Sequence, residues 1–354
     1  MNKIEEPLQL AHIACPNRVI RPAVQSFLGT TDGHMPDAEY DMYAELAANR
    51  VGTIISGHCA VSPIGRANPE QINIFADTYI PQFRKAAEII QAEGAHFIVQ
   101  ISHAGPRAVD VDDLVDVSAR PLKKNREARA LTLDEIRQIE QDFIRAAQRV
   151  QQAGADGVQL HAAHSYLLSR FIDTTFNQRT DAYGGSIENR FRIVENIVGG
   201  IQAACGPDFP IFIKINSDTK ADDAAYEQDM VYMLGRMKAL GIALVELSGV
   251  DFINQPRDAR LYYLERAARL RSAVDLPMSL VGGIRSLADM EQVLAAGIDM
   301  VSLGRPLIAE PDFIPKVLAG QEKAKCVSCC RCFVMPHMHP GVRCVLRRPR
   351  RVKS

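Results

Sequence analysis

Short apolar runs and longer amphipathic stretches alternate along most of the chain. Eight of these runs have the length and composition of buried strands, and they cover 19–23, 52–56, 96–101, 156–160, 211–215, 243–247, 278–281 and 299–303. The stretches between them predict helices, and strands separated by helices pair in parallel through right-handed crossovers. Eight such units favour an α/β fold of the closed (β/α)8 or TIM-barrel type over an open sheet.

Residues that start and end helices agree with this division. Four expected helices end at a glycine that can adopt positive φ, namely Gly94, Gly154, Gly241 and Gly297. Thr132 and Ser286 each stand three positions before an acidic residue, an arrangement that caps a helix start. The rhythm stops at about Ala319, which predicts a barrel domain over 1–320 and a short cysteine-rich C-terminal appendage over 321–354.

One connection is unusually long. The polar segment 104–131 exceeds an ordinary loop between a strand and a helix. We expect it either to cover the mouth of the barrel or to be a disordered insertion.

Charge and hydropathy restrict the partners. The 354 residues carry a formal net charge of −1, so neither nucleic acid nor a membrane is expected as a partner. No apolar stretch approaches the ~20 residues that span a bilayer, and the first residues lack the pattern of a signal peptide. We expect a cytoplasmic protein that acts on a small molecule, and the sequence is compatible with a homo-oligomer. The basic run 343–353 is expected to be a solvated tail.

The segment 157–167 contains the most informative side chains. An alternating apolar strand ends there at His161, followed by His164 and Tyr166. Two imidazoles can hydrogen-bond one carbonyl oxygen and stabilise the charge that develops on it, while a phenol can protonate a nearby carbon. These three residues are the predicted catalytic groups, and the histidines also the predicted substrate-binding groups. Taken alone, the motif fits zinc ligands or structural histidines equally well.

Other polar residues and glycines follow other strands, where the active groups of a TIM barrel lie. Gln100, Lys214 and Ala60 stand at or near the ends of strands three, five and two. Buried polar side chains at such positions indicate either a ligand or an internal polar network. The loops after strands seven and eight predict a phosphate site that is formed by Gly282, Gly283, Gly304 and Arg305.

Together these motifs resemble the Old Yellow Enzyme family of flavin-dependent NADH:flavin oxidoreductases. The most specific part runs from His161 to Phe171 and continues from Asn177 to Arg190, and the resemblance covers nearly the whole chain up to Arg305.

The resemblance implies a non-covalent FMN across the mouth of the barrel. Gln100 would meet the pyrimidine edge of the flavin, and Lys214 would lie near its N1 and C2 carbonyl. The phosphate would be held by Gly283, Gly304 and Arg305, and the remaining implied cofactor contacts are Ala23, Gln25, Ala60 and Gly282. Gln25 stands where the family often has Thr or Cys, so the flavin potential is expected to differ from the family norm.

The activity that the resemblance implies is that of an ene reductase, in which NAD(P)H reduces FMN and hydride then passes to the β-carbon of an activated alkene. His161 and His164 would bind the oxygen of the electron-withdrawing group, and Tyr166 or solvent would protonate the α-carbon. The sequence specifies neither the natural acceptor nor a preference for NADH or NADPH.

The tail adds a second possible cofactor. Cys326, Cys329, Cys332 and Cys344 resemble the cluster-binding segment of the iron–sulfur branch, such as 2,4-dienoyl-CoA reductase, although the third cysteine is one position early. The further flavin and nucleotide domains of that branch are expected to be absent. We expect metal-free thiols first, a 4Fe-4S cluster second and zinc third. An iron–sulfur flavoenzyme of the 2,4-dienoyl-CoA reductase or demethylase type is therefore the alternative function.

Two other classes stay open. A metal-dependent hydrolase would use His161 and His164 as ligands, with His103 and Asp218 as the remaining candidates, but it leaves the phosphate loops without a role. A non-catalytic flavin or phosphate binder would be yellow without turnover.

Overall fold

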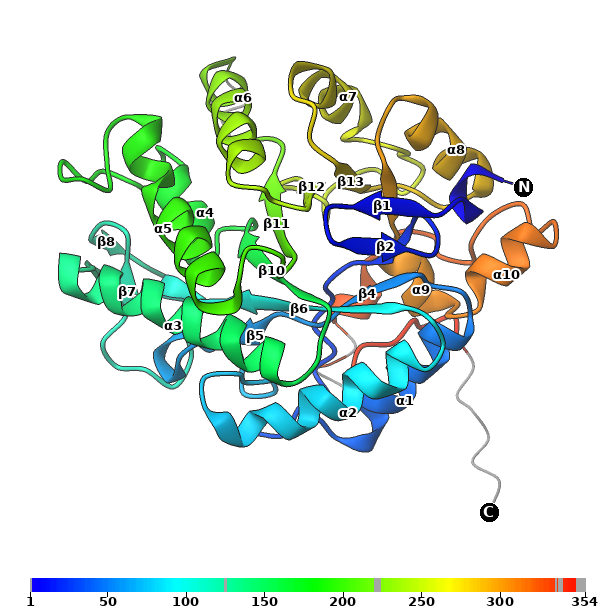
Figure 1. Ribbon diagram of the computed structural model, residues 1–354, viewed down its shortest axis with the longest axis horizontal. Coiled ribbons are helices and arrows are strands. Elements are labelled where there is room, and N and C mark those ends of the chain that lie inside the picture. The colour runs from blue at the N-terminus through cyan, green and yellow to red at the C-terminus, as the bar shows by residue number, and fades with distance from the viewer. Residues whose placement is uncertain (1, 124–125, 220–223, 335, 337–339, 348–354) are drawn as a thin grey trace.

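Eight parallel strands close into a barrel (Figure 1). The computed structural model describes residues 2–123, 126–219, 224–334, 336 and 340–347. In their order around the barrel the strands are β3 (Val19–Arg21), β4 (Thr53–Ile55), β6 (His96–Ser102), β10 (Gly157–Ala162), β11 (Ile211–Asn216), β12 (Leu244–Ser248), β13 (Met278–Val281) and β14 (Met300–Ser302). Parallel pairing of β14 with β3 completes the ring. The predicted (β/α)8 fold is confirmed, with strand ends within two residues of the expected ones.

Helices surround the strands (Figure 1). The main ones are α1 (Asp37–Ala48), α2 (Ile80–Gln91), α3 (Leu133–Gln152), α5 (Ile187–Cys205), α6 (Ala224–Ala239), α7 (Leu264–Ala273) and α8 (Leu287–Ala295). Buried residues of α3 recur every three or four positions, as an amphipathic helix on a barrel requires. Thr132 and Ser286 cap α3 and α8 by accepting hydrogen bonds from backbone N–H groups, as predicted. The four helix-ending glycines all have positive φ.

The shorter elements complete the chain between and after these helices. They are η1 (Lys3–Glu5), β5 (Cys59–Ala60), η2 (Pro63–Gly65), η3 (Asp77–Tyr79), η4 (Gly105–Arg107), α4 (Leu167–Ile172), α9 (Arg305–Ala309), α10 (Phe313–Leu318) and η5 (Arg331–Phe333).

A hairpin closes the amino-terminal end of the barrel. Strands β1 (Leu8–Leu10) and β2 (Ile13–Cys15) pair in antiparallel fashion and lie across that end in Figure 1. Their buried side chains form one apolar cluster with residues at the starts of the barrel strands, including Ile98 and Met300. Because this end is filled, a ligand can enter the barrel only from the carboxyl ends of the strands.

The long segment 104–131 is folded where the structure describes it. It contains β7 (Val115–Asp116), β8 (Arg120–Pro121) and β9 (Glu127–Ala130), which form a small three-stranded sheet. Arg129 forms ion pairs with Asp113 and Glu135 and so ties the segment to the start of α3. The expectation of a disordered insertion is wrong for these residues; residues 124–125 lie outside the described part.

The cysteine-rich tail folds back onto the barrel. After α10, the N–H of Val342 donates to the carbonyl oxygen of Ser26, and Arg347 forms an ion pair with Glu45 of α1. The tail therefore contacts the loop that follows β3. The end of the predicted solvated run, 348–354, lies outside the described residues.

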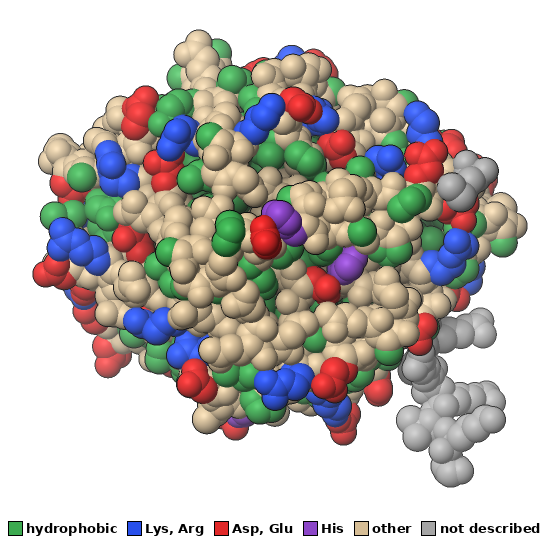
Figure 2. Space-filling view, viewed as in Figure 1, with side chains coloured by type: hydrophobic (Ala, Val, Ile, Leu, Met, Phe, Trp, Pro, Cys, Tyr) green, Lys and Arg blue, Asp and Glu red, His purple; other side chains and the backbone are tan. Residues whose placement is uncertain are grey.

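The visible surface in Figure 2 carries acidic and basic side chains in a mixed arrangement, which agrees with the near-zero net charge. Among the described residues, no helix combines the length and the apolar character needed to cross a membrane.

Candidate active site

A cavity of about 650 Å³ lies at the carboxyl ends of the strands. Residues from six successive strands or the loops directly after them line it, namely Gln100, His161, Lys214, Ser248, Gly282 and Ser302. Its volume falls in the range of roughly 300–1,000 Å³ that is typical of sites for cofactors and small molecules. The structure thus brings the predicted residues of separate strands to one cavity.

The two histidines and the tyrosine of the sequence motif are neighbours in this cavity. The ring centroids of His161 and His164 are 5.4 Å apart, and those of His161 and Tyr166 are 4.4 Å apart. The imidazole Nδ1 of His161 is buried without a hydrogen-bond partner in the described structure. A buried polar atom of this kind indicates a missing partner, so the geometry favours a ligand oxygen between the histidines.

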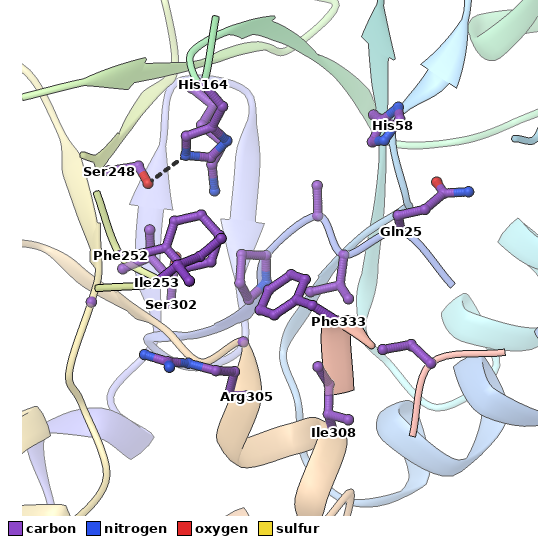
Figure 3. Close-up of a pocket in the computed structure, with 18 of the residues that line it drawn as sticks. Gln25, His58, His164, Ser248, Phe252, Ile253, Ser302, Arg305, Ile308 and Phe333 are labelled. Carbon is purple, nitrogen blue, oxygen red and sulfur yellow. Dashed lines mark hydrogen bonds between the residues drawn. The ribbon is translucent and has the colours of Figure 1, made fainter. Parts of the chain in front are cut away.

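The backbone after β10 is strained where it turns these side chains into the cavity. His164 and Ser165 both have φ of 59°, which is uncommon for residues other than glycine. The Asn216 side chain accepts a hydrogen bond from the backbone N–H of His164, and Nε2 of His164 lies 2.8 Å from the Ser248 hydroxyl (Figure 3). Ends of two neighbouring strands, β11 and β12, therefore hold the strained turn.

Burial determines the protonation states of the three groups. Desolvation lowers the pKa of His164 to about 3 and holds the pKa of His161 well below its usual range. Desolvation raises the pKa of Tyr166 to about 12, although the nearby Arg107 opposes this shift. At neutral pH both imidazoles are neutral and the phenol is protonated, as hydrogen-bond donors and a proton donor must be.

We predict that the protein becomes less stable as the pH falls from about 6.5 to about 4. Burial lowers the pKa values of His58 and His103 to about 4, below the value of 6.5 in an unfolded chain, so the unfolded chain binds more protons in this window. Each such histidine contributes a slope of about 1.4 kcal/mol per pH unit to the free energy of unfolding. Urea unfolding at several pH values should show a shallower slope in His103→Gln than in the wild type. An identical slope would contradict neutral burial of His103.

A chain of buried polar side chains crosses the barrel below the cavity. The Gln100 side-chain amide donates to Gln159 at 2.6 Å, and Gln159 donates to Glu246 at 3.0 Å. Lys214 forms an ion pair with Glu246 at 3.0 Å, and both side chains are at most 5% exposed. The internal polar network, one of the two alternatives for Gln100 and Lys214, is therefore present, and both residues also line the cavity, as contact with a ligand would require.

The loop with Gly282 and Gly283 and the loop with Gly304 form another part of the cavity wall. Gly282 and Gly283 have φ of 141° and 71°, and a Cβ on Gly283 would lie 2.5 Å from the backbone nitrogen of Leu261. Arg305, at the start of α9, donates to the Tyr262 hydroxyl at 2.8 Å and to the Cys330 sulfur at 3.0 Å. Only glycine allows the backbone to approach this closely, so the wall has the form of a close-fitting cradle.

Ala60 and Gln25, two of the predicted cofactor contacts, have hydrogen-bond partners within the protein. Ala60 lies in β5, is fully buried, and does not line the cavity. It pairs with the strand edge instead, since its N–H donates to the carbonyl oxygen of Ile72. Gln25 does line the cavity, but its side-chain amide donates to Asn68 and to the carbonyl oxygen of Glu70. Ala23 and Gly304 line the cavity as predicted.

The structure places further side chains at the candidate site that were not predicted from the sequence motifs. His58, directly after β4, places Nε2 3.2 Å from the Tyr166 hydroxyl. Phe252 packs against His164 and against Phe333 of the tail, with ring centroids 5.9 and 5.4 Å apart (Figure 3). The guanidinium of Arg107 lies 5.8 Å from the Tyr166 ring centroid. For His58 a usable signal existed, because it is a titratable residue at a strand end; for Phe252 and Phe333 the sequence offered none.

Five cysteines of the tail surround a second, much smaller cavity of about 20 Å³ beside Arg305, and they are Cys326, Cys329, Cys330, Cys332 and Cys344. Among the described residues, no three His, Cys, Asp or Glu side chains are grouped so that they could hold a single metal ion. The presence of these five thiols around one small cavity, which include the four predicted as cluster ligands, is compatible with either free thiols or a cluster. Iron and sulfide analysis of anaerobically prepared protein would decide between the two.

The model of the NADH:flavin oxidoreductase / NADH oxidase family matches residues 3–324. The chain belongs to this family. The predicted resemblance is thereby confirmed. Family membership contradicts the metal-dependent hydrolase hypothesis. Of its two extra candidate ligands, His103 accepts a hydrogen bond at Nδ1 from the N–H of Gly105, and Asp218 accepts one from the N–H of Val250.

Curated relatives agree with the family. An NADH oxidase of Thermoanaerobacter brockii is 30% identical over 336 residues, which are 91% of this chain and 52% of that protein. An NADPH dehydrogenase of Halalkalibacterium halodurans is 30% identical over 302 residues, which are 84% of this chain and 89% of that protein. The chain thus spans about half the length of the first relative and most of the second.

Solved structures show the same architecture. Morphinone reductase superposes with a TM-score of 0.79 at 26% identity, covering 92% of this chain and 91% of that one. A 2-naphthoyl-CoA reductase in complex with 2-naphthoyl-CoA gives a TM-score of 0.90 at 24% identity, covering 98% of this chain and 57% of that one. The second likeness supports the fold alone.

Proposed function

We propose that the protein is an FMN-dependent ene reductase that uses NAD(P)H to reduce the activated C=C bond of an α,β-unsaturated carbonyl compound. The observation that carries the proposal is the convergence of His161, His164 and Tyr166 on the same cavity as the glycine cradle and Lys214. Family membership supports the flavin and the nicotinamide donor.

The glycine loop and the basic side chains of the cavity both fit FMN. Gly282 and Gly283 have positive φ and pack tightly against Leu261, Tyr262 and Tyr263, which fixes the loop backbone at the cavity wall, where its N–H groups would meet a phosphate. Basic side chains that line the cavity are Arg107, Lys214, Arg285 and Arg305, whereas its described lining contains no Asp or Glu. This charge suits a phosphate, and Lys214 also suits the negative charge of a reduced flavin.

The residues of the chain then have distinct tasks in the reaction. When bound, FMN would accept hydride from NAD(P)H and pass it to the β-carbon of the acceptor. His161 and His164 would donate hydrogen bonds to the acceptor oxygen and stabilise its developing negative charge. Tyr166 would release its hydroxyl proton to the α-carbon. For His164 to donate through Nδ1, its Nε2 must accept the Ser248 proton, and the 2.8 Å contact permits that.

The iron–sulfur flavoenzyme of the 2,4-dienoyl-CoA reductase or demethylase type is the second candidate. It is favoured by one observation, the gathering of the tail cysteines around a single small cavity next to Arg305. A four-iron cluster there would be ligated by Cys326, Cys329, Cys332 and Cys344, the set predicted from the sequence.

Anaerobic stopped-flow spectroscopy tests the proposal. NAD(P)H should bleach the flavin absorbance, and 2-cyclohexenone should restore it with formation of the saturated ketone. Protein that is reduced by NAD(P)H but reoxidised only by dioxygen, with no alkene of a broad panel consumed, would contradict an ene reductase.

We predict that Gly283→Ala weakens FMN binding at least roughly tenfold, which corresponds to about 1.4 kcal/mol. The new methyl group would lie 2.5 Å from the backbone nitrogen of Leu261 and 2.8 Å from the Tyr262 ring, so the loop would have to shift, and φ of 71° is unfavourable for alanine. Gly297→Ala is the matched control, because Gly297 has φ of 89° but no heavy atom within 4 Å of the added Cβ. Fluorescence titration of apoprotein with FMN gives both dissociation constants, and equal values in the two variants would exclude the cradle as a cofactor contact.

A further inference from the structure

Among the residues that the structure describes, the hydrogen-bond partner of the Tyr166 hydroxyl is His58. It is buried, and its ring centroid is 5.1 Å from that of Tyr166 in an edge-to-face arrangement. A neutral imidazole has one nitrogen that donates and one that accepts. The role of His58 toward Tyr166 therefore depends on which of its nitrogens carries the proton.

Gln71 fixes that choice from the far side of the ring. The backbone N–H of Ala67, which can only donate, lies 2.5 Å from Oε1 of Gln71, so this atom must be the amide oxygen. The other end of the amide is then the NH2 group. One contact joins this group to Nδ1 of His58 at 2.6 Å, and a second joins it to the carbonyl oxygen of His58 at 3.0 Å.

An NH2 group 2.6 Å from Nδ1 requires a lone pair on that nitrogen. The proton of the neutral ring then lies on Nε2, the nitrogen 3.2 Å from the Tyr166 oxygen. Burial lowers the pKa of His58 to about 4, so the ring stays neutral at pH 7. With Nε2–H as the donor, the Tyr166 oxygen is the acceptor in this pair, and its own proton must point elsewhere.

We propose that His58 is a positioning residue for Tyr166, donating its Nε2 proton to the phenol oxygen so that the hydroxyl proton is presented to the acceptor in the cavity. This inference rests on the proposed function for the role of Tyr166 as the proton donor. When the phenol releases its proton to the α-carbon, the same N–H stabilises the phenolate that remains, and solvent restores the proton afterwards. Gln71 acts one step further out by holding the tautomer.

The tautomer can be measured without any turnover. Long-range ¹H–¹⁵N spectra of protein labelled with [¹⁵N]histidine, with His58→Gln used for assignment, should show a protonated Nε2 and an unprotonated Nδ1 at pH 7. Gln71→Leu should shift this pattern toward a mixture of tautomers. A proton on Nδ1, or a doubly protonated ring, in the wild type would overturn the proposal.

Kinetic measurements test whether His58 acts through Tyr166. His58→Leu should slow flavin reoxidation by 2-cyclohexenone roughly tenfold, the worth of one hydrogen bond to a developing charge. His58→Gln, which keeps an N–H donor, should recover part of the rate. In a Tyr166→Phe background, His58→Leu should have no further effect. The surface variant His12→Leu is the control.

The results distinguish failure of the proposed role of His58 from failure of the proposed function. An equal loss with and without the Tyr166 hydroxyl, or no loss at all, would overturn the positioning role of His58. A wild-type protein that NAD(P)H does not bleach would contradict the proposed function instead, and the NMR spectra would still decide the tautomer.

Discussion

Replacing both His161 and His164 by alanine is expected to slow flavin reoxidation by 2-cyclohexenone at least about a hundredfold, which is the cost of losing one well-placed donor to a developing oxyanion. His161 is buried and His164 half-buried, both imidazoles are neutral and close together, and Nδ1 of His161 has no partner in the described structure. Donors held in such a dry cavity stabilise charge far better than water can, so their removal should affect the rate more than acceptor affinity alone.

Ligand binding provides an independent measure of the same contact. A phenolate that binds over the oxidised flavin should give a long-wavelength charge-transfer band, and His161→Ala should weaken this binding. His12→Ala, at the exposed surface, is the control and should leave the titration unchanged. A wild-type titration curve in His161→Ala would remove that histidine from its proposed role.

Lys214→Met should strongly destabilise the barrel interior, lowering the free energy of unfolding by about 3–5 kcal/mol. Lys214 is the charged partner of Glu246, and neither side chain is more than 5% exposed. Removing the lysine leaves a buried carboxylate whose remaining hydrogen bond, among the residues that the structure describes, comes from the Gln159 amide. The variant should also bind FMN more weakly, because the positive charge in the cavity is lost.

A second substitution distinguishes the buried charge from lost packing. In Lys214→Met combined with Glu246→Gln, the uncompensated charge is gone and most of the lost stability should return. Urea unfolding of the wild type, both single variants and the double variant measures the coupling. Additive effects of the two substitutions would show that the pair is not coupled across the barrel.

The barrel was predictable because its signals are local. Each strand is a short apolar run, and capping residues such as Thr132 and positive-φ glycines such as Gly154 stop or start helices whatever lies far away. The motif at His161 was equally visible, since its three chemical groups are close in sequence. The parallel barrel then brings separate strand ends together, which explains why Gln100 and Lys214 reach the same cavity.

The contacts that the sequence did not reveal join distant segments. Ala60 was expected at the cofactor from its order in the chain; in the structure it lies in β5, which pairs with β6, and it is not among the residues that line the cavity. The position of Phe333 depends on how the tail returns to the barrel, and no local pattern encodes that path. The tautomer of His58 depends on an amide of Gln71 that is itself oriented by a backbone group.

In this protein we expect the cavity to bind FMN next to the neutral side chains of His161 and His164. The most direct test is the visible spectrum of the purified protein, before and after addition of FMN and removal of the excess by gel filtration. We expect a flavin spectrum with one FMN retained per chain, and less FMN retained by Gly283→Ala than by Gly297→Ala. Folded protein that stays colourless after incubation with FMN would contradict the account.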